Sequence, residues 1–573
     1  MAPRRTQGGA RRPGGRSRGD GGAGRAAPRR VRLLVVVAVV VLGLLAGRAA
    51  FLGVVKADAL SALAESQHEV GFATPAPRGA IMSSDGQELA GDRPTVNVSA
   101  TPFLITDPVG AARRLGPLIG REPEELVEQL DATNGYALLA RDLAPADARR
   151  AKALEIPGID FVDTYERYLP AGPRASQVVG LTNADRIGIS GIEQQYEDAL
   201  TGDPGHRVEA RDPFKRPLRV LASKEAVPGQ SVHLTLDSVI QSRVEQVLLN
   251  TREEFGAKSA MAVVMRPRDG AILAMANVPR FNPANRKSVN DELARNRAVT
   301  DAFEPGSVFK IVTIAGALEE GVVEPGTRFH LPTKLETYDR TLEDAHEREP
   351  INASVTQILQ RSSNIGTVLI AQRLGRDKVV KWIDRFGFGK PTGIDYPGEA
   401  RGLVRKAEEW SGVSITNIPL GQGIGVTLMQ LVGAYAAIAN GGYQVTPHLA
   451  ATVGDQVVAG KRGPRLMSAA TARQVDRMLR DVVDVEGTGA QAAIKGYRVA
   501  GKTGTANKID PETGEYANRY IASFVGYLPA DNPELLIAVV VDEPGYPYYG
   551  GDVAAPAFEQ IAEYSLQMLE ISP

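Results

Sequence analysis

The sequence predicts an α/β domain with an antiparallel sheet flanked by helices, on an elongated α+β pedestal, after one N-terminal transmembrane helix. Two strand-like runs, 261–265 and 271–275, flank Arg268-Asp269-Gly270 and are typical of a β-hairpin. Further runs with the composition of strands lie near the C-terminus, at 498–506, 520–527 and 535–541. Helical patterns separate the hairpin from these strands, and a last one covers 557–569. The sheet is therefore assembled from distant parts of the chain.

The chain begins with a basic segment of low hydrophobicity. Residues 1–32 contain ten arginines and one acidic residue, Asp20, among many glycines, alanines and prolines. Such a segment cannot bury a core, so we predict a disordered tail, for which a nucleic-acid-binding arm is the alternative interpretation. The apolar run that follows favours a cytoplasmic tail, because clustered arginines keep the adjoining end of a membrane helix in the cytoplasm.

Residues 33–55 are apolar except for Arg48, and a bilayer core requires about 20 helical residues. We therefore predict a single-pass anchor in the cytoplasmic (inner) membrane, with everything after it on the outer side. A cleavable signal peptide is the alternative, because Ala57-Asp58-Ala59 resembles a small-x-small cleavage site. The charge of Arg48 either reaches the outer headgroups or faces a polar group on a partner membrane helix.

Residues 56–227 have the pattern of a non-catalytic pedestal. A helical pattern continues the anchor over 57–70, and 75–90 indicates two strands joined by a Ser-Asp-Gly turn. Short helices are expected at 110–119, 122–130 and 145–154, and an amphipathic helix before Gly202. No catalytic constellation precedes Val227, and Val-Pro-Gly-Gln marks a boundary there. We therefore predict that residues 228–573 form the catalytic domain.

Composition restricts the chemistry. At 573 residues the chain is long enough for two or three domains, and its net charge of -1 does not indicate nucleic-acid binding. The absence of cysteine excludes disulfides, thiol catalysis and cysteine-ligated metals. The six histidines lack metal-ligand spacing, so we expect neither a metal nor another cofactor.

The catalytic hypothesis starts from Ser307 and Lys310. A Pro-Gly pair precedes Ser307 and an apolar helical pattern follows it as far as Leu318, which predicts that Ser307 lies in the first turn of a helix. Lys310 is one turn further along, on the same face. A desolvated, neutral lysine can take the proton of a serine hydroxyl. Taken alone, the pattern is equally explained by a helix cap followed by a surface lysine.

Two further stretches favour the catalytic interpretation. Ser362 and Asn364 supply a hydroxyl and a carboxamide two residues apart, after a helix-like run. A predicted strand carries a lysine, two threonines and a glycine that would admit a ligand backbone: Lys502, Thr503, Gly504 and Thr505. Ser-x-x-Lys, a Ser-x-Asn-like pair and Lys-Thr-Gly, in this order, are the signature of penicillin-binding proteins and serine β-lactamases.

From the anchor to the C-terminus, the chain resembles monofunctional class B penicillin-binding proteins, the D,D-transpeptidases that cross-link peptidoglycan. Stretches that add to the resemblance are 77–81, 188–193, 296–298, 434–442 and 487–489. The lead-in 303–307 and the stretch 548–558 are similar to the cell-division (septal, FtsI-like) branch. In contrast, Gly421-Gln422-Gly423 is more similar to elongation enzymes, and Met82-Ser83-Ser84 replaces the usual acidic-basic pair. An elongation-type transpeptidase is therefore the alternative.

The resemblance implies how the ester forms. Ser307 would attack the carbonyl between the two terminal D-alanines of a stem peptide, with Lys310 as the general base. Ser362 would relay a proton to the leaving D-alanine, and Asn364 would hold Lys310 and the donor's backbone. A second stem peptide's amine would then resolve the acyl-enzyme, and β-lactams would acylate Ser307.

The resemblance also implies how the substrate is bound. Lys502 would supply positive potential, and the hydroxyls of Thr503 and Thr505 would bind the terminal carboxylate beside Gly504. The backbone N–H groups of Ser307 and Thr505 would form the oxyanion hole.

Partners and competing functions follow from the same resemblance. A SEDS-family glycosyltransferase (FtsW-like) and other divisome membrane proteins are expected partners, because the sequence shows no second catalytic domain. A β-lactamase or carboxypeptidase is one alternative, although no glutamate stands out as a deacylation base. A β-lactam sensor, or a divisome scaffold with little turnover, is another. The acceptor amine, the oligomeric state and the presence of an outer membrane are left open.

Overall fold

The computed structural model describes residues 27–58, 69–131, 135–211, 217–338, 340–510 and 512–573. The N-terminal helix α1 covers Ala27–Ala50 and continues as the π-helical turn η1, Phe51–Val55. Val31–Val55 is long and apolar enough to cross a membrane. The helix starts before the predicted boundary, so the last residues of the predicted tail are helical. Residues 1–26 of that tail, and 59–68 of the predicted stalk helix, lie outside the described residues.

The first sheet after the anchor has three strands in the order β1-β6-β7. Strand β1 covers Glu69–Thr74, so the helical pattern predicted as far as residue 70 gives way to a strand at Glu69. Its partners are β6, Gly205–Arg211, and β7, Pro217–Lys224.

A second sheet has the order β17-β16-β8-β2-β3-β4, and β5 also pairs with β3. Its strands are β2 (Ile81–Met82), β3 (Glu88–Ala100), β4 (Ala137–Leu143), β5 (Ile159–Tyr168), β8 (Val232–Leu234), β16 (Ala450–Val453) and β17 (Gln456–Val457). The predicted strand–turn–strand at 75–90 is confirmed by the antiparallel β2–β3 pair. The strand that follows the boundary at residue 227 is β8, which pairs in parallel with β2. This sheet therefore combines strands from both sides of the predicted boundary.

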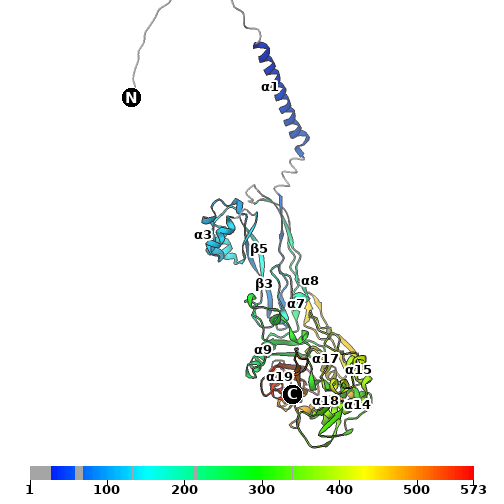
Figure 1. The fold of residues 1–573 in the computed structure, drawn as a ribbon. Coiled ribbons are helices and arrows are strands. Elements are labelled where there is room, and N and C mark those ends of the chain that lie inside the picture. Colours follow the sequence, from blue (N-terminus) through cyan, green and yellow to red (C-terminus); the bar gives the residue numbers. More distant parts are fainter. Residues whose placement is uncertain (1–26, 59–68, 132–134, 212–216, 339, 511) are drawn as a thin grey trace, which may run out of the picture. The chain divides into compact units, whose positions relative to one another are not determined.

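Three short helices cover the end of β3 and its partners (Figure 1): α3 (Pro108–Ile119), α4 (Pro123–Leu130) and α5 (Pro145–Lys152). Their positions agree with the predicted helices. The amphipathic helix predicted before Gly202 is present as the short helix α8 (Glu197–Leu200), and a further short helix, α7 (Gly191–Gln195), precedes it. The non-helical Tyr196 separates them, and its hydroxyl donates to Asp395 over 2.6 Å.

A buried ion network joins two of the stretches that carry the family resemblance. Arg78 and Arg167 donate to the carboxylate of Glu193 over 2.6 and 2.7 Å. Arg167 also pairs with Asp92 at 3.2 Å, and Arg186 pairs with the other oxygen of Asp92. Because these side chains come from four separate segments, the network holds the pedestal's tertiary structure in one arrangement.

The catalytic sheet has five strands in the order β10-β9-β21-β20-β19, and every neighbouring pair is antiparallel. The strands are β9 (Ser259–Met265), β10 (Ile272–Val278), β19 (Ala500–Ile509), β20 (Tyr516–Leu528) and β21 (Leu535–Asp542). The predicted hairpin and the three predicted C-terminal strands are thus confirmed. The strand with the Lys-Thr-Gly motif, β19, is the edge strand, so one side of it is available to a ligand.

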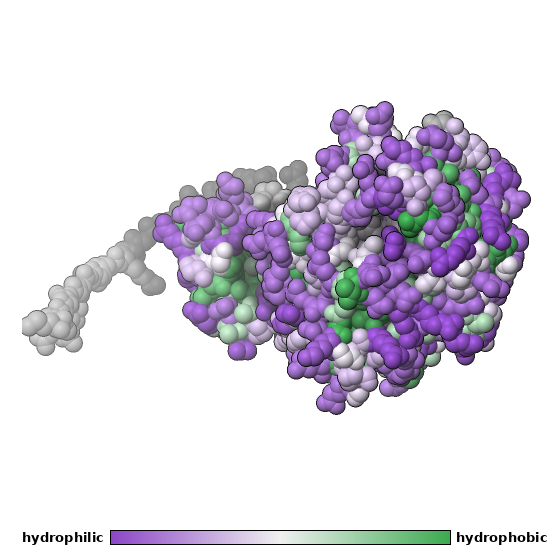
Figure 2. Space-filling view, turned by 90° about the horizontal axis from the view of Figure 1, so that it is seen from below, coloured by the Kyte–Doolittle hydropathy of each residue, from purple (hydrophilic) through white to green (hydrophobic). Residues whose placement is uncertain are grey.

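Helices cover both faces of this sheet (Figure 1). Helix α9 (Ser238–Glu254) and helix α19 (Gly550–Met568) pack on one face and α17 (Leu428–Ala439) packs on the other, and α12 (Lys310–Glu319) belongs to the core on the α17 side. Side chains alternate between the two cores along β9: Met261 and Val263 belong to the core that contains α17, whereas their neighbours belong to the core that contains α9. Polar residues cover most of the molecular face in Figure 2, and apolar residues form small separate areas on it.

The remaining elements belong to the insertion between the hairpin and β19. Its helices are α10 (Asp291–Ala294), α11 (Arg297–Thr300), α13 (Val355–Gln360), α14 (Asn364–Leu374), α15 (Arg376–Arg385), α16 (Ser414–Asn417) and α18 (Ala469–Val483). Its strands pair two by two as β11–β14, β12–β13 and β15–β18. They cover Arg328–Leu331, Ile351–Ser354, Lys334–Thr337, Arg340–Glu343, Tyr443–Val445 and Arg462–Arg465, in that order.

Candidate active site

Ser307 lies at the entrance to helix α12. The residues Gly306–Phe309 form a 3₁₀ turn, η4, and α12 begins at Lys310, so the predicted helix start is present in a tighter form. Gly306 has φ of +58°, and a Cβ there would lie 2.7 Å from the carbonyl oxygen of Thr505. Only glycine fits this close approach without displacement. Ser307 itself is half-buried between the buried Gly306 and Val308, so its hydroxyl is accessible at a fixed position.

Lys310 is fully buried at the start of α12. Its Nζ donates to the carbonyl oxygen of Ser362 over 2.6 Å and to Oδ1 of Asn364 over 2.8 Å, and the Ser362 hydroxyl lies 3.3 Å away. Burial lowers the pKa of Lys310 to about 7, and the negative charge of Asp344 opposes part of this effect. The structure therefore places an amine whose pKa is close to neutral pH where the sequence predicts a base.

Ser362 lies in the constrained connection between α13 and α14, and Asn364 is the first residue of α14. Ser362 has φ of +57°, a left-handed conformation that residues with a side chain rarely adopt. Ser363 caps α14 by accepting from the N–H of Gly366 over 3.0 Å. The amide of Asn364 is oriented by two contacts, because its Nδ2 donates to the carbonyl oxygen of Glu343 over 3.1 Å while its Oδ1 faces Lys310.

Lys502 is also fully buried, on the edge strand β19. Its Nζ donates to the carbonyl oxygen of Thr503 over 3.2 Å and to its hydroxyl over 3.3 Å. Burial, and secondarily the charge of Lys310, lower the pKa of Lys502 well below its ordinary value. The charge of Lys310 therefore acts on Lys502 across the site, although almost two hundred residues separate the two lysines in the chain.

The rest of the Lys-Thr-Gly-Thr stretch contacts the protein on several sides. The hydroxyls of Thr503 and Thr488 are 2.8 Å apart, and that of Thr505 accepts from the N–H of Gly550 over 3.0 Å. A Cβ at Gly504 would lie 2.8 Å from the carbonyl oxygen of Pro305. The close approach predicted for a ligand at Gly504 is thus made here by the chain segment that leads into Ser307.

Aromatic rings surround this end of β19. Tyr520 and Tyr548 are stacked with ring centroids 3.8 Å apart, and Tyr549 lies next to the loop after β13, with its ring 5.6 Å from that of His346. Tyr549 directly precedes Gly550, which bonds Thr505. Sequence reasoning did not single out His346, an ordinary polar residue in its own segment, and it noted Thr488 only as part of the stretch 487–489 that adds to the family resemblance.

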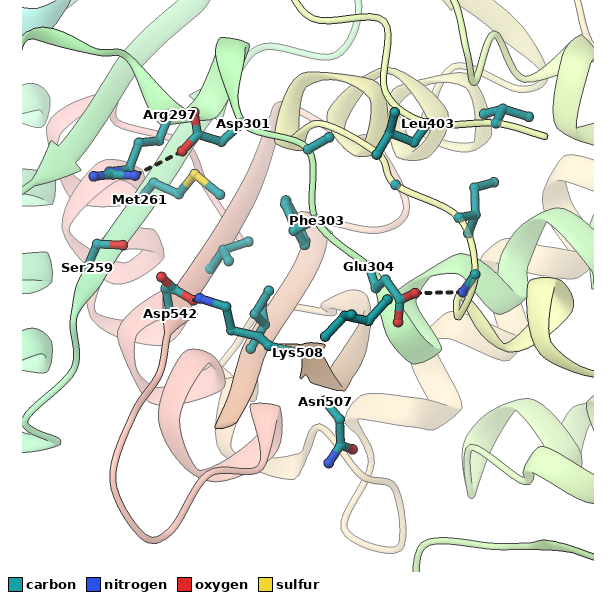
Figure 3. A pocket seen from close by; sticks show the side chains of 18 of the residues that line it. Ser259, Met261, Arg297, Asp301, Phe303, Glu304, Leu403, Asn507, Lys508 and Asp542 are labelled. Atoms are coloured by element: carbon teal, nitrogen blue, oxygen red, sulfur yellow. Dashed lines mark hydrogen bonds and ion pairs between the residues drawn. The ribbon is translucent and has the colours of Figure 1, made fainter. Parts of the chain in front are cut away.

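A cavity of about 720 Å³ lies on the other side of the segment that leads into Ser307 (Figure 3). Apolar side chains such as Met261, Phe303 and Leu403 contribute to its lining. Several of its charged groups are engaged: Arg297 pairs with Asp301 at 2.9 Å, Lys508 with Asp542 at 2.7 Å, and Glu304 accepts from the N–H of Gly423 over 2.7 Å. The contact of Glu304 with Gly423 ties the segment before the serine to the 421–426 loop.

The half-buried serine, the buried lysine of depressed pKa and the hydroxyl-rich edge strand are the parts needed to transfer an acyl group through a serine ester. The fold and this site define a serine acyltransferase. Comparison with known proteins assigns it further. The model of the penicillin-binding protein transpeptidase domain matches residues 260–563, and that of the penicillin-binding protein dimerisation domain matches residues 73–234.

Individual relatives agree with this assignment. The chain is 32% identical over 553 residues to the peptidoglycan D,D-transpeptidase FtsI of Escherichia coli K12, covering 95% of this chain and 92% of the relative. It is 34% identical over 550 residues to the probable peptidoglycan D,D-transpeptidase PenA of Neisseria meningitidis, covering 94% and 93%. The chain belongs to the class B penicillin-binding proteins, in the FtsI-like branch.

The fold is shared with a solved structure of the family. The crystal structure of penicillin-binding protein 3 from Mycobacterium tuberculosis in complex with aztreonam superimposes with a TM-score of 0.68 at 30% identity. The match covers 87% of this chain and 98% of that one. The predicted family and fold are therefore confirmed.

Proposed function

We propose that this chain is a D,D-transpeptidase that cross-links peptidoglycan stem peptides during septal cell-wall synthesis, and that β-lactams inactivate it by acylating Ser307. The observation that carries the proposal is the environment of Lys310, a fully buried amine with a pKa of about 7, held by Ser362 and Asn364. At neutral pH about half of such amines are uncharged and able to accept a proton. Ser307, one turn before it, is the nearest candidate nucleophile in sequence.

The acylation step uses these groups in order. Ser307 Oγ bonds to the carbonyl carbon of the penultimate D-alanine while its proton passes to Nζ of Lys310. The oxyanion is stabilised by the N–H groups of Ser307 and Thr505, each worth about 3 kcal/mol in comparable acyl transfers. The bond to the terminal D-alanine then breaks, and its nitrogen receives the proton through the hydroxyl of Ser362, which lies 3.3 Å from Nζ.

Deacylation repeats the sequence with a new nucleophile. The amine of a second stem peptide attacks the ester carbonyl, Lys310 takes a proton from that amine, and the bond to Ser307 Oγ breaks as the oxygen regains its proton. An amine replaces an amine, so the peptide-bond energy of the donor is retained in the cross-link. Water in place of the amine would give a carboxypeptidase, whose product would be a free stem peptide rather than a cross-linked one.

Substrate binding is assigned to the edge strand and to Asn364. Thr505 Oγ1 accepts from Gly550, which leaves its hydroxyl hydrogen for the terminal carboxylate of the donor. One hydrogen of Asn364 Nδ2 is engaged by Glu343, and the second is available to the donor's backbone carbonyl. Thr503 and Lys502 add a hydroxyl and positive potential, and the missing side chain of Gly504 keeps the strand flat.

We propose the domain division that the sequence suggests: a cytoplasmic tail (1–32), a membrane span (33–55), a non-catalytic pedestal (56–227) and the transpeptidase domain (228–573). The arginines before the span support a cytoplasmic N-terminus. A SEDS-family, FtsW-like glycosyltransferase and other divisome membrane proteins are the proposed partners of the anchor and pedestal. Purification of the tagged full chain from membranes without co-purification of such a polymerase would contradict this partnership.

Labelling with a fluorescent penicillin tests the enzymatic proposal. The wild type should retain a covalent label through denaturation, and Ser307→Ala should retain none. Ser84→Ala, which removes an exposed hydroxyl from the β2–β3 turn, serves as the matched control and should label like the wild type. Rapid release of the label would indicate a β-lactamase, and growth supported by Ser307→Ala would indicate a scaffold. Concentration of the label along the side wall would assign the chain to elongation instead.

A further inference from the structure

We propose that Asp344 is a positioning residue of this active site, which fixes the Ser362–Asn364 connection and places a negative charge beside Lys310. The inference rests on the proposed function, because it names what holds the proposed base and proton relay in place. Asp344 follows strand β13 and is distant in sequence from both motifs.

The carboxylate of Asp344 closes the start of helix α14. Its Oδ1 accepts from the backbone N–H groups of Asn364 and Ile365 over 2.6 and 3.1 Å. The hydroxyl of Ser363 lies 3.0 Å from both carboxylate oxygens. The first N–H groups of a helix have no partner within it, and they carry the positive end of the helix dipole. The carboxylate therefore fixes the backbone of Asn364 by charge-assisted hydrogen bonds.

Fixing that backbone also fixes the contacts of Lys310. The side chain of Asn364 accepts from Nζ over 2.8 Å and donates to the carbonyl oxygen of Glu343 over 3.1 Å. Residues 343 and 344 thus hold both the side chain and the backbone of Asn364. The carbonyl of Ser362, the other strong acceptor for Nζ at 2.6 Å, belongs to a residue with φ of +57°. Such a conformation persists only where the surrounding contacts enforce it.

Arg348 keeps the carboxylate of Asp344 in position. Its guanidinium is 2.7 Å from Oδ2, and it also donates to the carbonyl oxygens of Leu331 and Pro332 over 3.1 and 3.2 Å. The side chains of Asp344 and Arg348 are only 11% and 20% exposed. A largely buried carboxylate requires such a partner, and the arginine ties it to the segment between β11 and β12.

Burial and the charge of Asp344 act on Lys310 in opposite directions, because burial disfavours its protonated form and Asp344 favours it. Lys502, on β19, is the second buried lysine of the site, and the charge of Lys310 contributes to lowering the pKa of Lys502. Burial lowers the pKa of Lys310 to about 7 in spite of Asp344. Removing the charge of Asp344 must therefore lower this pKa further. Removing the charge of Arg348 must raise it, because the carboxylate is then less neutralised.

The test measures the second-order rate constant of acylation by a fluorescent penicillin from pH 5 to 9 for four proteins. Asp344→Asn should lower the plateau about 10- to 100-fold, because the relay and the base are no longer aligned. It should also move the acid limb of the profile to lower pH. Glu347→Gln, which removes a negative charge from an exposed residue of the same loop, should match the wild type in both respects. Arg348→Gln should move the limb to higher pH.

Each outcome decides the proposal. If the Asp344→Asn variant folds and its acylation rate falls at the same pH as that of the wild type, the proposal is overturned, whether or not the plateau rate is lower. A residue that only caps a helix would leave the pKa of the base unchanged. If Asp344→Asn does not fold, the direction of the limb in Arg348→Gln decides: higher pH supports the proposal, and any other result overturns it. A wild type that is not labelled would remove the proposed function itself. A labelled wild type with Asp344→Asn equal to Glu347→Gln overturns only this inference.

Discussion

Lowering the pH from 8 to 5 should slow the acylation of Ser307 about 100-fold, because only the neutral form of Lys310 accepts the serine proton. Burial lowers the pKa of this amine to about 7, against the weaker opposing effect of Asp344. The rate should therefore follow a single acid limb centred near pH 7.

The magnitude follows from the protonation equilibrium. With a pKa of about 7, about 90% of the amines are neutral at pH 8, half at pH 7 and about 1% at pH 5. The difference from the ordinary 10.5 corresponds to an electrostatic penalty of about 5 kcal/mol on the charged form. Between pH 7 and 10.5 the unfolded chain binds the extra proton, so the free energy of unfolding should rise with pH there. Below pH 7 both states are protonated and this contribution is constant.

The assay is a quenched time course with a fluorescent penicillin at half-unit steps of pH, with circular dichroism at each pH to verify folding. Lys310→Arg provides the control, because a guanidinium stays protonated throughout the range and should abolish labelling at every pH. A wild-type rate constant that changes less than about threefold between pH 8 and pH 5 in folded protein would refute the assignment of Lys310 as the base, since the neutral fraction changes far more.

Two substitutions test the packing around the site. Gly504→Ala should reduce the rate of acylation at least about tenfold. The added Cβ would lie 2.4 Å from the hydroxyl oxygen of Ser523 and 2.8 Å from the carbonyl oxygen of Pro305. Normal labelling of this variant would contradict the prediction and show that β19 can shift freely. Glu193→Gln should lower the free energy of unfolding by about 3–5 kcal/mol, because the buried guanidinium groups of Arg78 and Arg167 would each lose their ion pair with Glu193. Glu166→Gln breaks the half-exposed pair with Arg93 and should change it by less than about 1 kcal/mol in the same urea titration.

The catalytic sheet was predictable because its strands carry strong local patterns. The hairpin 261–275 has a turn between two apolar runs, β20 is rich in aromatic residues, and half of β21 is β-branched. The pairing of β8 with β2 was harder to predict, because Val232–Leu234 is short and its partner strand is distant in the chain. The short helix α7 at Gly191–Gln195 was not predicted, because it has only five residues and ends at Tyr196, whose hydroxyl bonds the distant Asp395.

In the candidate site, too, local sequence patterns predicted some residues and not others. Ser307, Lys310, Ser362 and Asn364 were found because their motifs are short and ordered. Asp344 was not found, since nothing near it in the chain distinguishes it from other surface acids. Its role depends on β13 lying against the start of α14, a contact that local sequence patterns do not encode. Gly504 was interpreted as space for a ligand, whereas the structure fills that space with the carbonyl of Pro305.

The sequence by itself determined the reacting groups, their order, the family and the antiparallel strands, because hydroxyls, amines and alternating side chains are properties of short segments. Only the tertiary structure decided that Lys310 is enclosed and that burial and the charge of Asp344 shift its pKa in opposite directions. A proton affinity depends on exclusion of water and on charges within a few ångströms, and both are set by segments that meet only in the folded chain.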